Sequence, residues 1–139
     1  MRILYLLLFA IFTLLVGVPN LEAEELGSNL AFIGSYDTAD EVRGVTILGN
    51  HAYIADFDGG VVILNIEAPT NPILIGSYDT EGYAYKINIS GNHAYIADYE
   101  NGVVILNIED PTNPILVGNY DTNAARDIAI SGNYAYVAD

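Results

Sequence analysis

The chain repeats itself with a period of 42 residues, and this period limits the folds that are open to it. The segment GVVILNIEAPTNPILIGSYDT begins at Gly60, and the near-copy GVVILNIEDPTNPILVGNYDT begins at Gly102. A third copy begins at Ile115 and runs to Asp139, with one residue fewer before its Gly-Asn pair. A fixed period of this length is typical of propellers, solenoids and other repeat arrays.

Each period has the pattern of four short β-strands. In the second unit, Ile87–Ser90 alternates apolar and polar residues, a Gly-Asn turn follows, and His93–Ala97 is the next predicted strand. Val103–Ile108 is a β-branched run typical of a strand covered on both faces. Two prolines then interrupt the ladder before the fourth strand, Ile115–Tyr120. This content predicts an all-β fold of four-stranded antiparallel propeller blades, about two and a half of them, after a leading outer strand at Leu30–Asp37.

The repeated residues also resemble those of a known family, the LVIVD repeat of bacterial and archaeal secreted and cell-surface proteins. The resemblance covers Asn29 to Asp139 and rests on VVILNIEDPTNPILVG, the YDT that follows, and SGNYAYVAD. Asn65 and Asn107 stand where the family usually has Asp. The resemblance implies a β-propeller outside the cytoplasm. It implies no activity, because function belongs to sites rather than to the fold.

The N-terminus has the composition of a secretory signal peptide. After a basic start comes an uncharged apolar run, Ile3–Val18, and the small residue Ala23 follows at a plausible cleavage point. We therefore expect residues 1–23 to be a signal peptide, residues 24–29 a short linker and residues 30–139 the propeller repeats. The alternative is an uncleaved membrane anchor, although the run is short of the roughly 20 residues that cross a bilayer. The expected location is exported: secreted, periplasmic or at the cell surface.

The number of repeats is smaller than a closed propeller needs, since closed propellers have about 4–8 blades. We expect the chain to be the N-terminal part of a longer propeller, truncated at the C-terminus. The alternative is a short array that completes itself by oligomerising. Both arrangements leave unpaired sheet edges, which are adhesive. The expected partners therefore include the remaining blades or further copies of the chain.

The charge balance excludes one large class of partner. The net charge is −14, and Arg43, Lys86 and Arg126 are the only Lys or Arg residues after the predicted signal peptide. Such a surface repels nucleic-acid phosphates and anionic lipids. We expect no nucleic-acid partner, and membrane contact only through an uncleaved N-terminal segment. The chain has no Cys, which excludes disulfides.

The connections between strands divide between two rims of the predicted propeller. Those from the second strand to the third, and from the fourth strand to the next blade, share one rim, where most acids lie and the repeats differ most. We call this the variable rim, comprising residues 37–43, 56–60, 79–85, 98–102 and 121–126. Variable loops on a constant scaffold usually carry specificity. We expect the variable rim and the strand starts beside it to bind a protein, glycan or cation through Asp40, Glu41, Arg43, Glu81, Tyr83, Tyr85, Lys86, Arg126 and Asp127.

Two turns on the variable rim are candidates for calcium. Asp56 and Asp58 lie in one turn and Asp98 and Glu100 in the equivalent turn, and closely spaced carboxylates suit Ca²⁺. Asp, Asn and Gly also form hairpin turns without a metal. Both interpretations stay open, and no other cofactor is expected.

The three basic residues lie at the start of the predicted inner strands. Arg43, Lys86 and Arg126 could form a collar that receives an anion at the channel mouth. The alternative is that they pair with the nearby carboxylates of Asp40, Glu41 or Asp127, as surface ion pairs do.

No set of residues with the pattern of a catalytic centre appears in the sequence. There is no nucleophile–base pair, phosphate loop or Cys/His cluster. His51 and His93 lie one repeat apart without a third ligand, so we interpret them as packing residues. The aligned Tyr53, Tyr95 and Tyr136 are interpreted as packing between blades. The sequence favours a non-catalytic binding module; the alternative is the N-terminal fragment of an exported propeller enzyme whose catalytic groups lie in further blades.

Overall fold

The computed structural model describes residues 11–16 and 31–139, and these residues form β-strands without any helix. This part of the chain thus offers no helix long and apolar enough to cross a membrane. The strands are β1 (Ile11–Val16), β2 (Ala31–Asp37), β3 (Gly44–Leu48), β4 (His51–Ala55), β5 (Val61–Asn65), β6 (Ile73–Tyr78), β7 (Lys86–Ser90), β8 (His93–Ala97), β9 (Val103–Asn107), β10 (Ile115–Tyr120), β11 (Asp127–Ser131) and β12 (Tyr134–Ala138).

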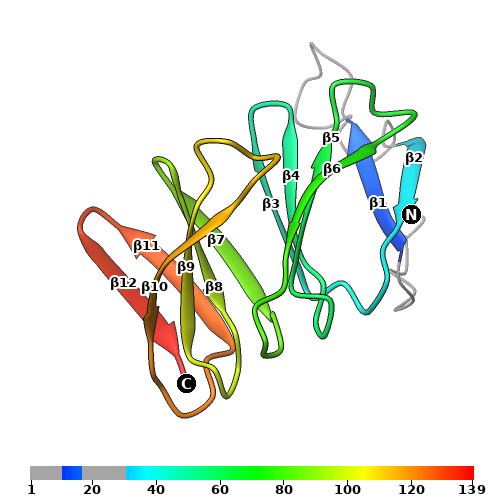
Figure 1. The fold of residues 1–139 in the computed structure, drawn as a ribbon. Helices are drawn as coiled ribbons and strands as arrows, with labels where there is room; N and C mark the ends of the chain where they lie inside the picture. Colours follow the sequence, from blue (N-terminus) through cyan, green and yellow to red (C-terminus); the bar gives the residue numbers. More distant parts are fainter. Residues whose placement is uncertain (1–10, 17–30) are drawn as a thin grey trace, which may run out of the picture.

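The strands form two complete blades flanked by two half-blades. Strands β3-β4-β5-β6 make one four-stranded sheet, blade 1, and β7-β8-β9-β10 make the next, blade 2. The pairs β1-β2 and β11-β12 are separate two-stranded sheets, which we call the N-terminal and C-terminal half-blades. All neighbouring strands are antiparallel, and Figure 1 shows the sheets side by side with the two half-blades at opposite ends. The predicted all-β architecture of propeller blades is confirmed.

The outer ladder of each unit has the same irregularity. In blade 1, Ile63 pairs with Gly76 and Leu64 with Leu74, which leaves Ile75 as an extra residue on the outer strand. Blade 2 has the same register shift between Leu116 and Gly118. A bulge of this kind bends the outer strand and increases its twist. The predicted fourth strand is therefore correct in extent but not regular.

The main core lies between blade 1 and blade 2. Tyr53 and Ile63 project from blade 1 into one cluster with Ile87, Ile96 and Leu106 of blade 2. Burying each such side chain contributes about 1.5–3 kcal/mol. The third strand of each blade, β5 or β9, is largely buried along its length, as its β-branched run predicted. Each blade thus depends on its neighbour for its core.

A glycine in the outer strand lets the next blade pack closely. A Cβ at Gly76 would collide with the carbonyl oxygen of Pro111, in the Pro-Thr-Asn-Pro corner of blade 2. Gly34 has the same relation to Pro69 in the corner of blade 1. The equivalent Gly118 would meet only the Ile105 side chain, at 3.7 Å, among the described residues. The repeated corner is thus a docking point between blades as well as a turn.

One prediction about packing is wrong in part. Tyr53 is buried between the blades, and Tyr95 is partly buried against the C-terminal half-blade. Tyr136 on β12 is instead exposed, because no further strand covers it in the described part of the chain. His51 and His93 are half-buried at the starts of β4 and β8, as expected.

The predicted signal peptide and linker fall largely outside the described residues. Of residues 1–23, the structure describes only Ile11–Val16, which form β1 and pair with β2. The proposed linker, residues 24–29, lies outside the described ranges. Cleavage and export therefore stay predictions.

Candidate functional site

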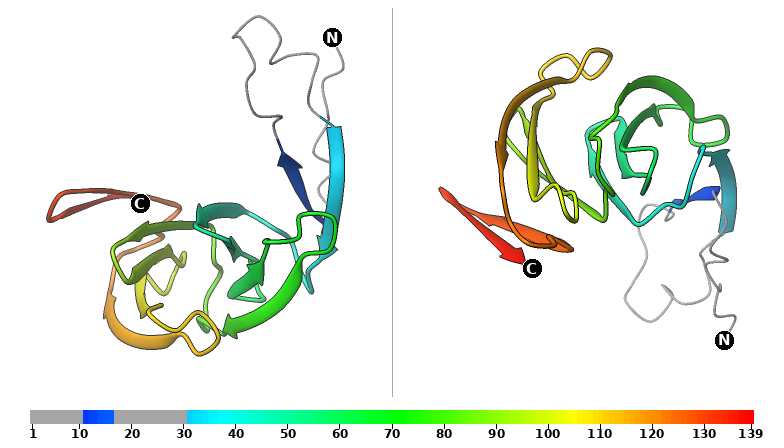
Figure 2. Two further views of the ribbon diagram at one scale, coloured as in Figure 1. Left: turned by 90° about the horizontal axis from the view of Figure 1, so that it is seen from above. Right: turned by 60° about the horizontal axis from the view of Figure 1, so that its bottom comes forward.

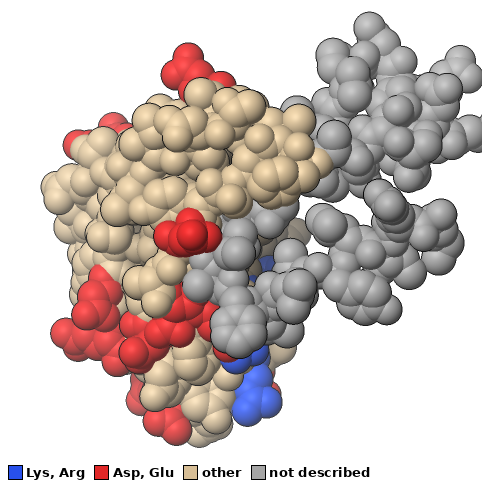
Figure 3. Space-filling view, turned by 90° about the vertical axis from the view of Figure 1, so that its right-hand side faces the viewer, with Lys and Arg blue, Asp and Glu red and all other residues tan. Residues whose placement is uncertain are grey.

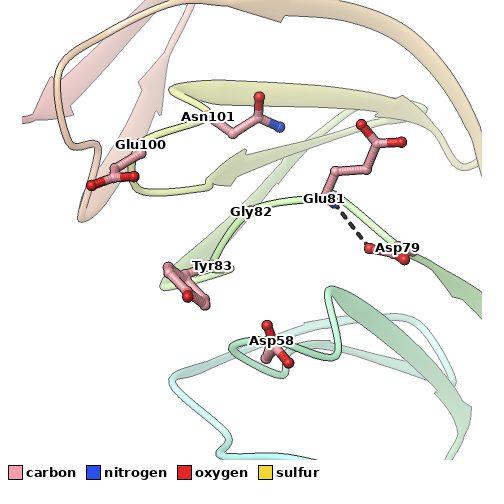
Figure 4. A pocket seen from close by; sticks show the side chains of 7 residues that line it. All are labelled: Asp58, Asp79, Glu81, Gly82, Tyr83, Glu100 and Asn101. Atoms are coloured by element: carbon pink, nitrogen blue, oxygen red, sulfur yellow. Dashed lines mark hydrogen bonds between the residues drawn. The ribbon is translucent and has the colours of Figure 1, made fainter.

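An open pocket of about 540 Å³ lies on the variable rim, where blades 1 and 2 meet. It draws residues from three connections: the turn between β4 and β5, the segment between β6 and β7, and the turn between β8 and β9. Figure 4 shows these side chains around it. The lining residues are Asp58, Asp79, Glu81, Gly82, Tyr83, Glu100 and Asn101.

The pocket is strongly acidic. Four of its lining residues carry carboxylates, and none of the lining residues that the structure describes is Lys, Arg or His. Figure 3 shows acidic side chains gathered toward the lower part of the molecule, where the variable rim lies in Figure 1. Negative charges gathered in a concave surface raise the local concentration of cations. The chemistry of the pocket therefore suits a cationic group.

Backbone and amide hydrogen bonds hold parts of the pocket wall in place. The backbone N–H of Glu81 donates to Asp79 Oδ1 at 2.9 Å, and Glu81 has a φ of 64°. The Asn101 amide donates to the Thr80 carbonyl at 2.7 Å and to Asp98 Oδ2 at 3.0 Å. The connections on either side of the pocket are thus tied together.

Aromatic residues of the variable rim cluster next to the pocket. The Phe57 and Tyr83 rings stack with centroids 4.6 Å apart and planes 11° apart. Tyr85 lies 5.6 Å from Phe57 and 5.5 Å from Tyr99 by ring centroids. Tyr83 joins this aromatic cluster (Phe57, Tyr83, Tyr85 and Tyr99) to the acidic pocket, where it remains exposed.

Two members of the aromatic cluster have a left-handed backbone. Phe57 has a φ of 43° and Tyr99 a φ of 49°, a conformation that costs bulky residues about 1–3 kcal/mol. Hydrogen bonds with the next unit support it: Ala84 N–H donates to the Phe57 carbonyl at 2.9 Å, and Tyr99 N–H to the Ala125 carbonyl at 2.9 Å. These contacts tie the two turns to the connection that follows the next outer strand.

The basic residues belong largely to this scaffold. Arg43 donates from Nη2 to Glu41 Oε2 at 2.6 Å, and its guanidinium lies 4.9 Å from the Phe57 ring centroid. Arg126 lies 5.3 Å from the Tyr99 ring centroid. Such cation–π contacts contribute about 0.5–1 kcal/mol at exposed sites. The sequence left two interpretations of the basic residues open, an anion-binding collar and pairing with nearby carboxylates. For Arg43 the structure shows pairing, with Glu41.

Asp56 and Asp98 are the buried first residues of two turns of the variable rim, and they link consecutive units. The Thr38 hydroxyl donates to Asp56 Oδ1 at 2.6 Å, and the Thr80 hydroxyl donates to Asp98 Oδ1 at the same distance. Both carboxylates are fully buried. Each link joins a threonine just after one outer strand to the aspartate directly after the second strand of the next blade. We call these contacts the Thr–Asp links.

Burial raises the pKa of Asp98 above its ordinary value, and hydrogen bonds from Thr80 and Asn101 offset part of this shift. Burial likewise raises the pKa of Asp56, partly offset by the bond from Thr38. Their folded-state pKa values thus exceed those of the unfolded chain. Their contribution to stability is therefore fully present below an unfolded pKa of about 3.9 and is lost as pH rises through the folded values.

We therefore expect the free energy of unfolding of the chain to fall as pH rises above about 4, with part of the slope due to Asp98. Urea unfolding between pH 4 and pH 7 measures this slope. Asp98→Asn should flatten it, whereas Asp121→Asn, which removes an equal charge at an exposed position, should flatten it less. Equal slopes for the two variants would contradict a special role for the buried carboxylate.

The structure separates the four calcium candidates into two kinds. Asp56 and Asp98 are engaged in the Thr–Asp links, whereas Asp58 and Glu100 are exposed and line the pocket. Within residues 11–16 and 31–139, no three His, Cys, Asp or Glu side chains are grouped as metal ligands would be. Calcium binding stays a prediction.

The remaining rim candidates fall at three places. Glu81 and Tyr83 line the pocket, and Tyr85 lies in the aromatic cluster. The others lie where the chain enters the inner strands: Asp40, Glu41 and Arg43 before β3, Lys86 at the start of β7, and Arg126 and Asp127 at the start of β11. The backbone N–H of Asp40 donates a hydrogen bond to Asp56 Oδ2 at 3.2 Å.

The sequence analysis placed four further residues of the site on the variable rim but did not single them out as binding candidates. Asp79 and Asn101 line the pocket, and Phe57 and Tyr99 belong to the aromatic cluster. The signal for the last two was available, since both directly follow the repeated Ile-Ala-Asp segment. An aromatic residue kept in a tight turn, where Asn or Gly is usual, indicates a specific contact.

The sequence comparison fits this arrangement. The sequence model of one protein family, described as LVIVD repeat, matches residues 40–80, 81–122 and 124–139. The chain belongs to the LVIVD-repeat family. Its first two LVIVD repeats correspond to blades 1 and 2, and the third matched segment corresponds to the C-terminal half-blade. No curated protein matches the chain.

The boundaries of the matched LVIVD repeats fall on the variable rim. Each begins between an outer strand and the next inner strand, so the pocket is formed at the junction of two repeats. Asp58 and Asp79 come from the first repeat, and the remaining lining residues come from the second. The site is thus a property of adjacent repeats and not of a single one.

Proposed function

We propose that this LVIVD-repeat protein is a non-catalytic binding module whose variable rim binds Lys or Arg side chains of a partner protein. The observation that carries the proposal is the pocket between blades 1 and 2, with four carboxylates around an exposed tyrosine. Export to the cell surface, predicted from residues 1–23, would place this rim among extracellular partners. Catalysis by groups in further blades stays the alternative prediction.

Two interactions would act together on a cationic side chain. The carboxylates of Asp58, Asp79, Glu81 and Glu100 supply charge-assisted hydrogen bonds. The Tyr83 ring, held by its stacking on Phe57, offers a face for a cation–π contact. The exposed position of these groups keeps each contribution small, so specificity would come from their arrangement.

Isothermal titration of the full chain with a tetralysine peptide tests this function. We expect Glu81→Gln together with Glu100→Gln to weaken binding about ten-fold, because two pocket carboxylates contribute roughly 0.2–1 kcal/mol each. Added salt should weaken binding further, since exposed charges are screened. Tyr83→Ala should weaken it without changing the net charge.

The control is a charge-matched pair on the opposite rim. Glu67→Gln together with Glu109→Gln changes the net charge equally, and both side chains are exposed beyond β5 and β9. This pair should leave tetralysine binding within two-fold of the unmodified chain, about 0.4 kcal/mol. Equal loss from both pairs would show attraction to net charge alone. Binding of a neutral oligosaccharide or of Ca²⁺ without any binding of tetralysine would also contradict the proposal.

A further inference from the structure

The turn between β8 and β9 contains an Asn-Gly pair, Asn101-Gly102, and this pair occurs once in the sequence. In such a pair the backbone nitrogen of the glycine can attack the side-chain carbonyl carbon of the asparagine, because glycine has no side chain to hinder the approach. Asn101 also lines the pocket (Figure 4). A chemically reactive pair thus lies in the wall of the candidate site.

The fold requires the glycine of this pair. Gly102 has a φ of 73°, in the left-handed region that glycine favours. A Cβ at this position would collide with the carbonyl oxygen of Tyr120, a backbone atom of β10. The equivalent Gly60 of blade 1 has a φ of 70°, and its Cβ would collide with the Tyr78 carbonyl oxygen in the same way. Glycine is therefore needed here whatever residue precedes it.

The turn itself does not require the asparagine. The equivalent residue in blade 1 is Gly59. Both turns nevertheless have the same closing hydrogen bond, in which the N–H of Asp56 or Asp98 donates to the carbonyl of the glycine four residues later, at 2.8 Å in each case. The contribution of Asn101 therefore lies in its side chain.

The closed turn holds both groups that would react. The Asn101 amide, which would be the leaving group, donates to the Thr80 carbonyl at 2.7 Å and to Asp98 Oδ2 at 3.0 Å. The nitrogen of Gly102, which would be the nucleophile, is buried, and its N–H donates to the Tyr99 carbonyl at 2.9 Å. All three hydrogen bonds must break before the reaction can occur. The folded turn therefore opposes a reaction that its sequence favours.

We propose that Asn101 is a deamidation site whose reaction is controlled by opening of the turn between β8 and β9. In the open turn, the Gly102 nitrogen forms a bond to Asn101 Cγ and the Cγ–Nδ2 bond breaks. The proton of the Gly102 N–H leaves with the amide as ammonia. A water molecule then opens the resulting succinimide ring and gives aspartate or isoaspartate. One water is consumed, one ammonia is released, and the chain gains one negative charge.

The product of this reaction does not restore the closed turn. A carboxylate in place of the Asn101 amide has no N–H to donate, and it would face the Thr80 carbonyl and the Asp98 carboxylate. Acceptors that lose their donor in a buried position are unfavourable. The reaction therefore converts a transient opening into a permanent one. It also adds a carboxylate to the lining of the pocket.

Mass spectrometry of the full chain during incubation at pH 7 measures deamidation, as the change in mass when the Asn101 amide becomes a carboxyl group. The same measurement in concentrated urea gives the rate for the unfolded chain. Hydrogen exchange of the Gly102 amide reports how often the turn opens, because exchange also requires release of this N–H. We expect folding to slow deamidation and exchange by the same factor, within about ten-fold, which corresponds to 1.4 kcal/mol.

Asp98→Ala distinguishes local opening of the turn from unfolding of the whole chain. It removes one acceptor of the Asn101 amide, so we expect deamidation to be about ten-fold faster, which corresponds to 1.4 kcal/mol, near the lower end for a hydrogen bond to a charged group. The matched control is Asp56→Ala, which removes the equivalent buried carboxylate of blade 1, bonded to Thr38 and Asp40. It should leave the rate within about two-fold of that of the unmodified chain. Circular dichroism checks that both variants are folded during the incubation.

Asn101→Asp places the product of the reaction in the chain and tests whether the turn closes again. We expect exchange of the Gly102 amide to be at least about ten-fold faster than in the unmodified chain, and the midpoint of urea unfolding to fall. Asn92→Asp is the control, because it changes the charge equally at an exposed position in the turn between β7 and β8, on the opposite rim. It should leave the exchange within about two-fold. This comparison does not depend on the folding of Asp98→Ala.

Several results would overturn the proposal. Deamidation of Asn101 as fast in the folded chain as in urea would show that the closed turn gives no protection, and no reaction in urea would show that the pair is unreactive. Equal acceleration by Asp98→Ala and Asp56→Ala would show that the whole chain must unfold. Unchanged exchange in Asn101→Asp would show that the turn closes again. These rates are measured without a ligand, so neither this inference nor the proposed function decides the other.

Discussion

Gly76→Ala is expected to destabilise the folded chain by about 3 kcal/mol, because overpacking at a rigid contact costs about 1–3 kcal/mol and occasionally more. The new Cβ would collide with the Pro111 carbonyl oxygen, a backbone atom of the neighbouring blade. Neither side of this contact is a flexible side chain, so relief requires blades 1 and 2 to separate. Separation would expose the core that contains Ile63 and Ile87. Urea unfolding followed by circular dichroism measures the loss.

Gly118→Ala provides the matched control for this substitution. Gly118 occupies the same place in blade 2, and its Cβ would meet only the Ile105 side chain, at ordinary van der Waals distance, in the described part of the chain. We expect no loss, or a gain of about 0.5 kcal/mol from the lower entropy of the unfolded chain. Both variants are to be compared at the same protein concentration. Similar losses for both would show that the strand itself, and not the corner of the next blade, requires glycine.

Asp98→Ala is expected to cost about 2–3 kcal/mol, because hydrogen bonds to a buried carboxylate contribute about 1.5–3 kcal/mol and their loss leaves buried donors unpaired. The Thr80 hydroxyl and the Asn101 amide both donate to Asp98. Part of the lost stability is offset because the substitution also removes the unfavourable burial of the carboxylate, the burial that raises the pKa of Asp98. Thermal and urea unfolding at pH 7 measure the net effect.

A double-mutant cycle with Thr80→Val isolates the Thr–Asp link. We expect a coupling energy of about 1–2 kcal/mol between the two positions, because residues in one hydrogen-bond network are not additive. Asp58→Ala, which removes an exposed carboxylate two residues from Asp56, should change stability by less than about 0.5 kcal/mol. Additive losses in the cycle would mean that the two side chains act separately and that the link contributes nothing.

The repeat predicted the architecture because its signals are local and occur more than once. The Gly-Asn turns, the β-branched run and the double-proline corner each correspond to an observed boundary, and the predicted strand Ile115–Tyr120 is found with the same bounds. The division into two rims follows from strand order alone, and it led to Glu81 and Tyr83, which line the observed pocket. The order of the strands and the division of their connections between two rims could therefore be predicted from the sequence.

The structural features that sequence did not supply depend on contacts between units. Asp56 and Asp98 were chosen as calcium candidates because of their spacing, whereas their burial depends on threonines 18 residues earlier in the chain. The exposure of Tyr136 could not be read from its alignment with the buried Tyr53, because burial depends on whether a neighbouring blade is present. Local pattern gives the strand, and the neighbour decides which residues are buried.

The Thr–Asp links suggest how arrays of this kind can change in length. Blade 1 carries the threonine of one link just after its outer strand, Thr80, and the aspartate of the preceding link directly after its second strand, Asp56. If one whole repeat is duplicated or deleted, one threonine and one aspartate are gained or lost together. The blades on either side can then still be joined by a Thr–Asp link. Recombination between near-identical DNA segments could alter the blade number in one step, while the turns of the variable rim diverge afterwards.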